Sequence, residues 1–428
     1  MNFHLLHPRD QLVAIMNRIY YNGMTTLSGG NLSIKDDDGS IWITPTGVDK
    51  GRLRPNDMVH VLPDGSVEGL HRPSSEFPFH RAIYAHRPDL KAVVHAHPPA
   101  LVSFSIAREV PATTIIPQAN RVCGTVGYAP YALPGSETLG ANIAATFAEG
   151  YNSVLLENHG IATGGDSLLD AFQRLETLDC CARILIAARK LGPVQTLTDE
   201  QLAPFDVVYN DLPEFQPDAH PSRVRELRQV IVEAVYRACD RYLMISTEGV
   251  VSARLDEDSF LITPTGKDRR TVDAEDIVLV REGQREKGKW PSRSVQMHQA
   301  IYQNHPAIRS IMIAQPPHAT AYAITKTSFD TRTIPESFIL LRDVVRLDHG
   351  TQYTRPESIA ATLSLETPVM LLTNDSVVTA GKSVLDAFDR LEVAEYSARS
   401  LIDAQVLGRM VPIDDQDIDQ LEVAFSLK

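Results

Sequence analysis

Two histidines two residues apart, His95 and His97, follow an apolar run that begins at Leu90. Successive side chains of a β-strand point to opposite faces, so these two imidazoles would emerge on one face and could hold one metal ion. A third histidine, His159, follows another apolar run, Ser153–Leu156. Three histidines that leave one coordination position open form the ligand set of a catalytic zinc site. The alternative is a pair of half-buried strand histidines whose nitrogens bind neighbouring carbonyl groups.

A carboxylate, Glu76, stands upstream of the histidine pair, at the start of a predicted helix. Beside a metal-bound carbonyl or hydroxyl compound, a carboxylate can act as a general acid or base. A glutamate at a helix N-terminus can also be explained by the helix dipole alone. His80 and Tyr84 lie one and two turns further along the same helix face. Both residues recur, as His298 and Tyr302, in a second copy of the sequence pattern that is described below and that lacks the metal-binding histidines. We therefore predict a structural role for both.

Three short polar loops could bind a phosphate group. Leu27–Asn31 contains a Gly-Gly-Asn turn whose backbone N–H groups could form an anion-binding nest. Thr44–Gly47 follows a predicted strand, and Pro73–Glu76 places two hydroxyls at a helix N-terminus, a favourable position for phosphate. Each loop also has a simpler explanation, as a chain reversal, an ordinary turn and a serine N-cap respectively. The candidate phosphate-binding residues are Gly30, Asn31, Thr46, Gly47, Ser74 and Ser75.

The chain contains two copies of one long sequence pattern. Ile43–Gly47 recurs as Ile262–Gly266, and Asp170–Glu176 recurs with few changes as Asp386–Glu392. A period of this length indicates tandem globular domains rather than a solenoid. The two predicted domains are residues 1–210 and 211–428.

The second copy lacks the chemical residues of the first. The aligned replacements are Asn31 by Val250, Glu76 by Ser294, His95 by Ile313, His97 by Gln315 and His159 by Asp375. Isoleucine and glutamine cannot supply two imidazoles, so we expect the second domain to be folded but metal-free.

The pattern of apolar and turn residues predicts a mixture of helices and strands. In the first copy we predict helices at 8–22, 74–87, 99–106, 136–149 and 167–190, and strands at 31–35, 40–43, 57–62, 90–94, 153–157 and 160–163. Because these elements do not alternate strictly as β-α-β, they indicate a mainly antiparallel sheet with helices packed on it.

The amino-acid composition limits the kinds of molecule that we expect this protein to bind. The chain has 428 residues, a globular mixture of 43% hydrophobic and 22% charged residues, and a formal net charge of -13. This acidic balance argues against nucleic acid or an anionic membrane as the main partner. No apolar run approaches membrane-spanning length, and we expect no signal peptide. The four cysteines form no Cys-x-x-Cys pair, which favours free thiols in a reducing cytoplasm.

In order and spacing, the Gly-Asn, Thr-Pro-Thr-Gly, Pro-Ser-Ser-Glu, His-x-His and Asn-His-Gly motifs resemble the class II aldolase/adducin family, with fuculose-phosphate aldolase as the nearest branch. The resemblance covers nearly all of residues 8–192. It implies an α/β chain of two tandem three-layer α-β-α domains, each with a mainly antiparallel central sheet flanked by helices. It implies one divalent ion per chain, usually Zn²⁺, on His95, His97 and His159. It also implies that Glu76 is the acid/base and that the six loop residues form a phosphate cradle.

The same resemblance bears on assembly and activity. Members form four-fold rings with active sites at subunit interfaces, so we expect a homo-oligomer in which two chains build a pseudo-tetramer. The expected activity is a metal-dependent aldehyde-lyase that cleaves or forms a carbon–carbon bond in a phosphorylated ketose or related sugar acid through an enediolate. Decarboxylation of a 3-oxo acid phosphate would use the same site and stays open. A non-catalytic scaffold, as in adducin, predicts degraded ligands, which fits the second domain but not the first.

Overall fold

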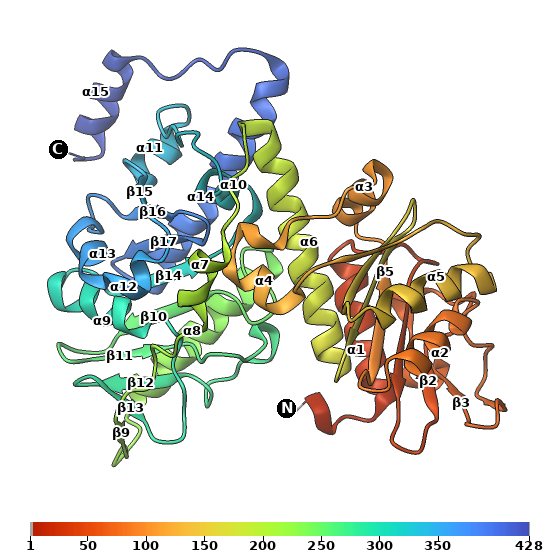
Figure 1. Cartoon of the computed structure of the whole chain (residues 1–428). Helices are drawn as coiled ribbons and strands as arrows, with labels where there is room; N and C mark the ends of the chain where they lie inside the picture. The colour runs from red at the N-terminus through yellow and green to blue at the C-terminus, as the bar shows by residue number, and fades with distance from the viewer. Residues whose placement is uncertain (1–2, 428) are drawn as a thin grey trace. The chain divides into compact units, whose positions relative to one another are not determined.

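The computed structural model describes residues 3–427, which divide into two compact units (Figure 1). The first unit extends to Thr113 and includes Gln118–Ala182, whereas the second contains Thr114–Pro117 and begins again at Arg183. The division falls within the long helix α6 (Leu168–Leu191). The predicted boundary between residues 210 and 211 separates the two copies of the sequence repeat, which is a different division from the two compact units. It stays a prediction.

The first unit is built on one sheet. Its strands are β1 (Asn31–Lys35), β2 (Ile41–Ile43), β3 (Val59–Val61), β4 (Val67–Glu68), β5 (Ala92–Ala96), β6 (Gly127–Ala129), β7 (Ser153–Leu156) and β8 (Gly160–Gly165). They lie in the order β4-β3-β2-β1-β5-β8-β7-β6, and neighbours are antiparallel except for β6 and β7. β5, which carries His95, lies at the centre of the sheet and is buried along its whole length.

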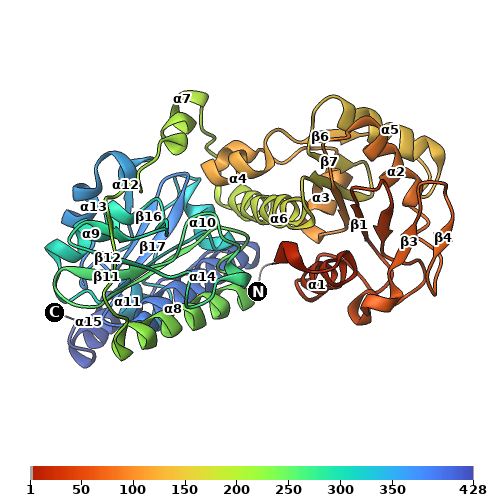
Figure 2. The same cartoon turned by 90° about the horizontal axis from the view of Figure 1, so that it is seen from below.

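Helices complete three layers around this sheet (Figure 2). They are α1 (Pro8–Tyr21), α2 (Phe77–His86), α3 (Pro99–Ala107), α4 (Pro117–Cys123) and α5 (Glu137–Ala148). α1 packs on β1 and β2, and α3 packs on β7 and β8. α2 and α5 pack on each other, and their apolar residues, including Phe79, Ile83 and Ile143, form a core with strand residues such as Val93.

The second unit repeats this arrangement. Its strands are β9 (Glu214–Phe215), β10 (Val250–Arg254), β11 (Ser259–Ile262), β12 (Val278–Arg281), β13 (Gln284–Glu286), β14 (Ser310–Ala314), β15 (Val345–Leu347), β16 (Val369–Leu372) and β17 (Ser376–Gly381). The order β15-β16-β17-β14-β10-β11-β12-β13-β9 reproduces the order of the first sheet strand for strand, with β9 added at one edge. This agreement is the structural sign of duplication that the sequence repeat predicts.

Helices again cover both faces of the second sheet. They are α7 (Asp199–Leu202), α8 (Ser222–Asp240), α9 (Val295–Asn304), α10 (Pro317–Ala323), α11 (Pro335–Leu341), α12 (Thr351–Thr354), α13 (Pro356–Thr362), α14 (Val384–Leu407) and α15 (Asp415–Ala424). α9 and α13 share an apolar core with the sheet, while α8 and α14 pack together against β10. The predicted fold class, two tandem α-β-α domains with mainly antiparallel sheets, is confirmed.

Two details of the predicted elements need correction. The sequence suggests a serine N-cap for the helix after Pro73, but α2 begins at Phe77 with Glu76 as its N-cap, and the Glu76 side chain makes no capping hydrogen bond. The Glu76 carboxylate accepts a hydrogen bond from Asn31, and the Ser74 hydroxyl accepts one from the Glu76 N–H, before the helix begins. α4 and β6 were not predicted, because each is short and lacks a clear periodic pattern.

Within residues 3–427, every helix is too short or too polar to cross a bilayer. The four cysteines are buried, and within residues 3–427 they form no disulfide bond.

Candidate metal centre

The structure brings the three predicted metal-binding histidines together. His95 is in β5 and His97 lies just beyond its end, while His159 occupies the turn from β7 to β8. The Nε2 atoms of His95 and His97 are 3.0 Å apart, and the ligand atoms of all three residues lie within 4.8 Å of one another. In the described part of the chain, this is the one group of three histidine, cysteine or acidic side chains close enough to share an ion.

The protonation state of these imidazoles suits the binding of a metal ion. Burial, together with the neighbouring histidines, lowers the pKa of His95 and His97 to about 3, and burial also lowers the pKa of His159. The rings are therefore neutral at pH 7, the form that binds metal. His95 Nδ1–H donates to the Ile161 carbonyl at 2.9 Å, which turns Nε2 toward the cluster. His159 Nδ1 is buried with no hydrogen-bond partner among the described residues. This donor set fits a divalent metal ion with an open position.

Two glycines make room for the histidines. A Cβ on Gly160 would lie 2.6 Å from both the Ala96 carbonyl oxygen and the His97 ring, and a Cβ on Gly29 would lie 2.8 Å from His97 Nδ1. The turn that carries His159 also requires an unusual backbone, because Asn158 has a φ of 52°, and asparagine tolerates this left-handed conformation better than most residues. Glycine and asparagine therefore allow the imidazoles to converge.

Glu76 lies against this cluster. Its Oε2 is 3.3 Å from His95 Nε2, and its Oε1 is 3.6 Å from His159 Nε2. The residue is 9% exposed, and Asn31 Nδ2 donates to Oε2 at 2.7 Å. A carboxylate at this place can transfer a proton to or from a compound bound at the open metal position.

The predicted phosphate-binding loops are tied to one another. The Ser74 N–H donates to the Thr44 carbonyl oxygen at 3.2 Å, and the Thr46 N–H donates to the Arg72 carbonyl oxygen at 3.1 Å. Ser74 Oγ accepts from the Glu76 N–H at 3.2 Å, which links this loop directly to the carboxylate. The remaining predicted positions lie as follows: Gly30 is buried with a φ of 72°, Gly47 is exposed with a φ of 70°, and Thr46 and Ser75 are exposed.

Sequence reasoning missed Lys50, a buried cation that connects two of these loops. Its N–H donates to the Leu27 carbonyl oxygen at 2.9 Å, and its Nζ donates to the Pro45 carbonyl oxygen at 2.5 Å. The residue is only 2% exposed, and burial lowers the pKa of its ammonium group to about 8. Only its place after the Thr-Pro-Thr-Gly motif could have marked it, since lysine is usually exposed.

Comparison with known proteins identifies the family of this chain. The family model for the Class II Aldolase and Adducin N-terminal domain matches residues 10–186 and 229–402. The chain belongs to the class II aldolase/adducin family. The predicted resemblance and the tandem arrangement are thereby confirmed.

Individual class II aldolase relatives differ in the reaction that they catalyse. The 3-oxo-tetronate 4-phosphate decarboxylase of Escherichia coli (strain K12) is 32% identical over 201 residues, which cover 46% of this chain and 93% of the relative. The 5-deoxy-D-ribulose 1-phosphate aldolase of Bacillus thuringiensis serovar kurstaki is 33% identical over 202 residues, with the same coverage of both chains. A solved structure of an L-fuculose 1-phosphate aldolase shares 34% sequence identity over 46% of this chain and 92% of that chain, with a TM-score of 0.42.

The second aldolase-like unit keeps the scaffold of the site without its ligands. Val250 faces Ile313 across β10 and β14, as Asn31 faces His95 across β1 and β5. This register supports the alignment by which the sequence repeat assigns the replacements. Asp375, at the place of His159, accepts hydrogen bonds from Gln352 Nε2 at 2.7 Å and from Ser376 Oγ at 2.8 Å, and burial raises its pKa.

A segment of the second unit also covers its counterpart of the Pro73–Glu76 loop, which is Pro291–Ser294. Arg293 donates to the Phe205 carbonyl oxygen and stacks on the Phe205 ring, 3.6 Å from its centroid. Asn210 Nδ2 donates to the Pro291 carbonyl oxygen at 2.6 Å. The segment that contains Phe205 and Asn210 therefore packs against this loop.

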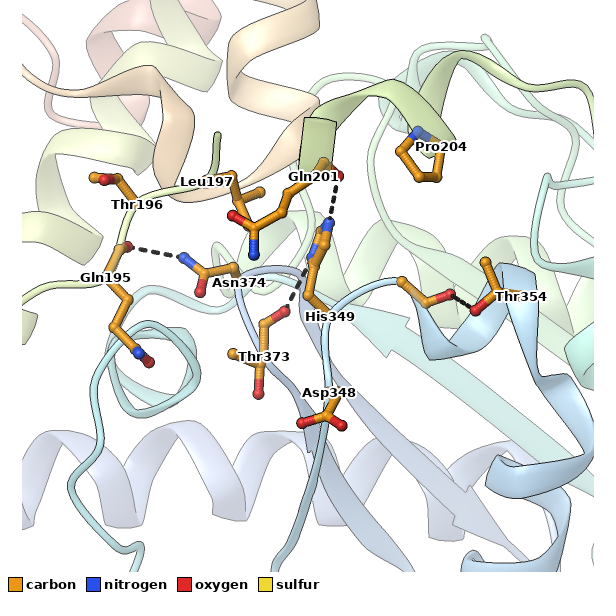
Figure 3. A pocket seen from close by; sticks show the side chains of 11 residues that line it. Gln195, Thr196, Leu197, Gln201, Pro204, Asp348, His349, Thr354, Thr373 and Asn374 are labelled. Atoms are coloured by element: carbon orange, nitrogen blue, oxygen red, sulfur yellow. Dashed lines mark hydrogen bonds between the residues drawn. The ribbon is translucent and has the colours of Figure 1, made fainter. Parts of the chain in front are cut away.

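A pocket of about 470 Å³ lies beside this segment in the second unit (Figure 3). The His349 ring lies between two backbone carbonyls, with Nε2 2.9 Å from the Gln201 oxygen and Nδ1 3.2 Å from the Thr373 oxygen. Asn374 Nδ2 donates to the Gln195 carbonyl oxygen at 2.8 Å. These side chains hydrogen-bond to backbone carbonyls of the segment and of β16–β17, and among the described residues no group of three potential metal ligands lies in this pocket.

Proposed function

We propose that the first unit is a divalent-metal-dependent aldehyde-lyase, with Zn²⁺ as the expected ion, acting on a small phosphorylated ketose or related sugar acid. Three neutral imidazoles and one carboxylate that converge on one point carry this proposal. The membership of the chain in a family that contains sugar-phosphate aldolases supports it.

An ion held by His95, His97 and His159 would polarise the substrate carbonyl and stabilise the negative charge that develops on its oxygen. Glu76 would take up or return the proton at the carbon beside that carbonyl, because its carboxylate is already held next to the histidines. The three tied loops would bind the phosphate through backbone N–H groups and hydroxyls. Binding at the phosphate would fix the reacting carbons relative to Glu76.

Decarboxylation of a 3-oxo acid phosphate is the second candidate, and the decarboxylase relative from E. coli favours it. The same groups would serve, since carbon dioxide rather than an aldehyde leaves as the carbon–carbon bond breaks. Wild-type chain supplied with zinc should be tested on phosphorylated ketoses and 3-oxo acid phosphates, with separate assays for aldehyde and carbon dioxide. The product that forms decides between the two candidates.

Metal analysis tests the site itself. We expect about one zinc ion per chain in the wild type and much less in His97→Ala, because one of three ligands is lost. Gln315→Ala, the corresponding change in the second unit, should leave the zinc content unchanged. A wild-type chain that binds no divalent metal and turns over no substrate would instead favour a scaffold role.

We also propose that two chains associate into a pseudo-tetramer of four aldolase-like domains, in which the metal-free domains line the active sites. Light scattering should then give the mass of two chains. A fully active single chain in solution would contradict this assembly.

A further inference from the structure

A line of buried polar side chains runs from the far end of α2 to the candidate metal centre. The Tyr84 hydroxyl lies 2.7 Å from Ser33 Oγ, which lies 2.7 Å from His80 Nδ1. On the other side of the imidazole, His80 Nε2 lies 2.5 Å from Asn31 Oδ1, and Asn31 Nδ2 lies 2.7 Å from Glu76 Oε2. Ser33 and His80 are fully buried, and Asn31 and Tyr84 are at most 4% exposed.

Donor and acceptor chemistry gives this line one direction. The Glu76 carboxylate accepts hydrogen bonds, so Asn31 must present its N–H₂ group to Glu76 and its oxygen to His80. Because an amide oxygen only accepts, His80 Nε2 must carry a proton and donate it. A flipped Asn31 amide would set its oxygen 2.7 Å from a carboxylate oxygen with no proton between them. Burial lowers the pKa of His80 to about 3, so the ring holds a single proton and Nδ1 accepts from the Ser33 hydroxyl.

The second unit supplies an internal comparison. His298 keeps the same neighbours, since Ser252 Oγ lies 2.7 Å from its Nδ1 and 2.6 Å from the Tyr302 hydroxyl. Val250 stands where the first unit has Asn31, and His298 Nε2 is buried without a hydrogen-bond partner among the described residues. The serine, histidine and tyrosine are therefore compatible with the fold alone, and the link from the histidine to an asparagine exists only where Glu76 also exists.

We infer that His80 and Asn31 are positioning residues: His80 Nε2–H fixes the orientation of the Asn31 amide, which in turn holds Glu76 Oε2 beside the metal histidines. This inference rests on the proposed function, because it concerns the residue proposed as the acid/base. It gives the two carboxylate oxygens different roles. Oε2 is held by Asn31, and Oε1, which lies 3.6 Å from His159 Nε2, is left to receive and return the substrate proton.

The consequence can be measured because His80 acts only through Asn31. In His80→Leu, the Asn31 amide loses its fixed orientation and Glu76 loses its anchor, so kcat should fall roughly 10- to 100-fold, as expected for a misplaced catalytic group. KM should change less than kcat, since His80 hydrogen-bonds to one candidate phosphate-binding residue, Asn31, and the other loop residues are not altered. His80→Gln keeps an N–H donor near the position of Nε2 and should recover most of the lost kcat.

The matched control is His298→Leu, which removes the same side chain from the same serine and tyrosine neighbours in the second unit. It should leave kcat unchanged. Zinc content should stay at about one ion per chain in all three variants, because no metal-binding ring is touched. In addition, ¹⁵N-histidine spectra of the wild type, assigned by comparison with His80→Gln, should show His80 as a neutral ring protonated at Nε2 down to pH 5.

The outcomes separate this inference from the proposed function. If the wild type is active and His80→Leu is as active as His298→Leu, the positioning role is wrong and the proposed function stands. If the wild type is inactive on every substrate, the proposed function fails, and the spectra still test the hydrogen-bond line. A His80 ring protonated at Nδ1 would overturn the assigned orientation whatever the activity. Should His80→Leu not fold, the kcat of His80→Gln and the wild-type spectra decide the matter.

Discussion

Replacing Lys50 with methionine should stabilise the first unit at neutral pH, because burial disfavours the ammonium charge. Burial lowers the pKa of Lys50 from 10.5 to about 8, although Nζ donates to the Pro45 carbonyl oxygen. Methionine has a similar length and volume and no charge, so the packing around position 50 should be kept.

The size of the effect follows from the two pKa values. Between pH 8 and pH 10.5 the unfolded chain binds more protons at Lys50 than the folded chain, so this residue makes stability rise with pH. Burying the charge costs about 3 kcal/mol at pH 7 and about 2 kcal/mol at pH 9. Methionine removes this cost but leaves the Pro45 oxygen without its donor, a loss of about 1 kcal/mol. Lys50→Met should therefore be more stable by about 2 kcal/mol at pH 7, and by about 1 kcal/mol at pH 9.

The chain contains two tryptophans, which makes the assay specific. Trp290→Phe leaves Trp42, a buried residue of β2, as the fluorescent reporter of the first unit. Urea unfolding of this background with and without Lys50→Met, at pH 7 and pH 9, gives the four free energies needed. Lys91→Met, at a lysine whose side chain is 42% exposed, is the control and should show no comparable pH dependence. A Lys50→Met variant that is less stable at pH 7, or a difference that does not change with pH, would refute the reasoning.

The buried charge also suggests why a lysine is present. The loop that accepts its hydrogen bond, Thr44–Gly47, is one of those predicted to bind phosphate. A substrate phosphate would compensate the charge, so inorganic phosphate should raise the urea midpoint of the wild type more than that of Lys50→Met. Equal shifts would show that Lys50 does not contribute to anion binding.

Three further predictions concern the site and the stability of each unit. Glu76→Gln should keep its zinc and lose about 10²- to 10⁴-fold in turnover, measured on the best substrate of the panel; unchanged turnover would exclude Glu76 as the acid/base. Gly160→Ala should bind less zinc, because its Cβ would lie 2.6 Å from the His97 ring. Ser376→Ala, the corresponding change in the second unit, should leave the zinc content unchanged. Equal zinc contents in the two variants would show that the site can adjust. Arg228→Met should destabilise the second unit by about 1–3 kcal/mol, because Glu286 loses the partner now 2.7 Å away and keeps only Lys289, at 2.8 Å, as an ion-pair partner. Urea unfolding followed by Trp290 fluorescence measures this, and an unchanged free energy of unfolding would contradict it.

Much of the fold could be predicted because its signals are local or repeated. The apolar run before His95 indicates a buried strand, and the duplicated motifs indicate two domains of the same fold. The three histidines could be grouped because each follows an apolar run, and the family resemblance adds the expectation that such strands share one sheet. Helix and strand ends were less predictable: the sequence starts a helix at Ser74 with a serine N-cap, whereas α2 begins at Phe77 and Glu76 takes the N-cap position.

The residues that hold the proposed catalytic groups in place could not be predicted. Sequence spacing does not show which side chains face each other across a sheet. Asn31 was assigned to phosphate alone, yet its place opposite His95 brings its amide to Glu76. The recurrence of His80 indicated a structural role, which its bond to Ser33 supports, but recurrence cannot reveal a second bond that only one copy makes. Lys50 was overlooked because lysine is usually exposed, and only its place after the Thr-Pro-Thr-Gly motif hints at a buried position.

The second unit shows that loss of the metal ligands was accompanied by loss of the space around them. Gly29 and Gly160, which must lack a side chain where they approach the His97 ring, correspond to Glu248 and Ser376. Once the imidazoles are absent, nothing requires glycine at these positions, and larger polar side chains can fill the volume. Restoring histidines alone would therefore place their rings against the Glu248 and Ser376 side chains. The metal-free state of the second unit is fixed by at least two kinds of residue, those that bind and those that make room, and only the first unit keeps both.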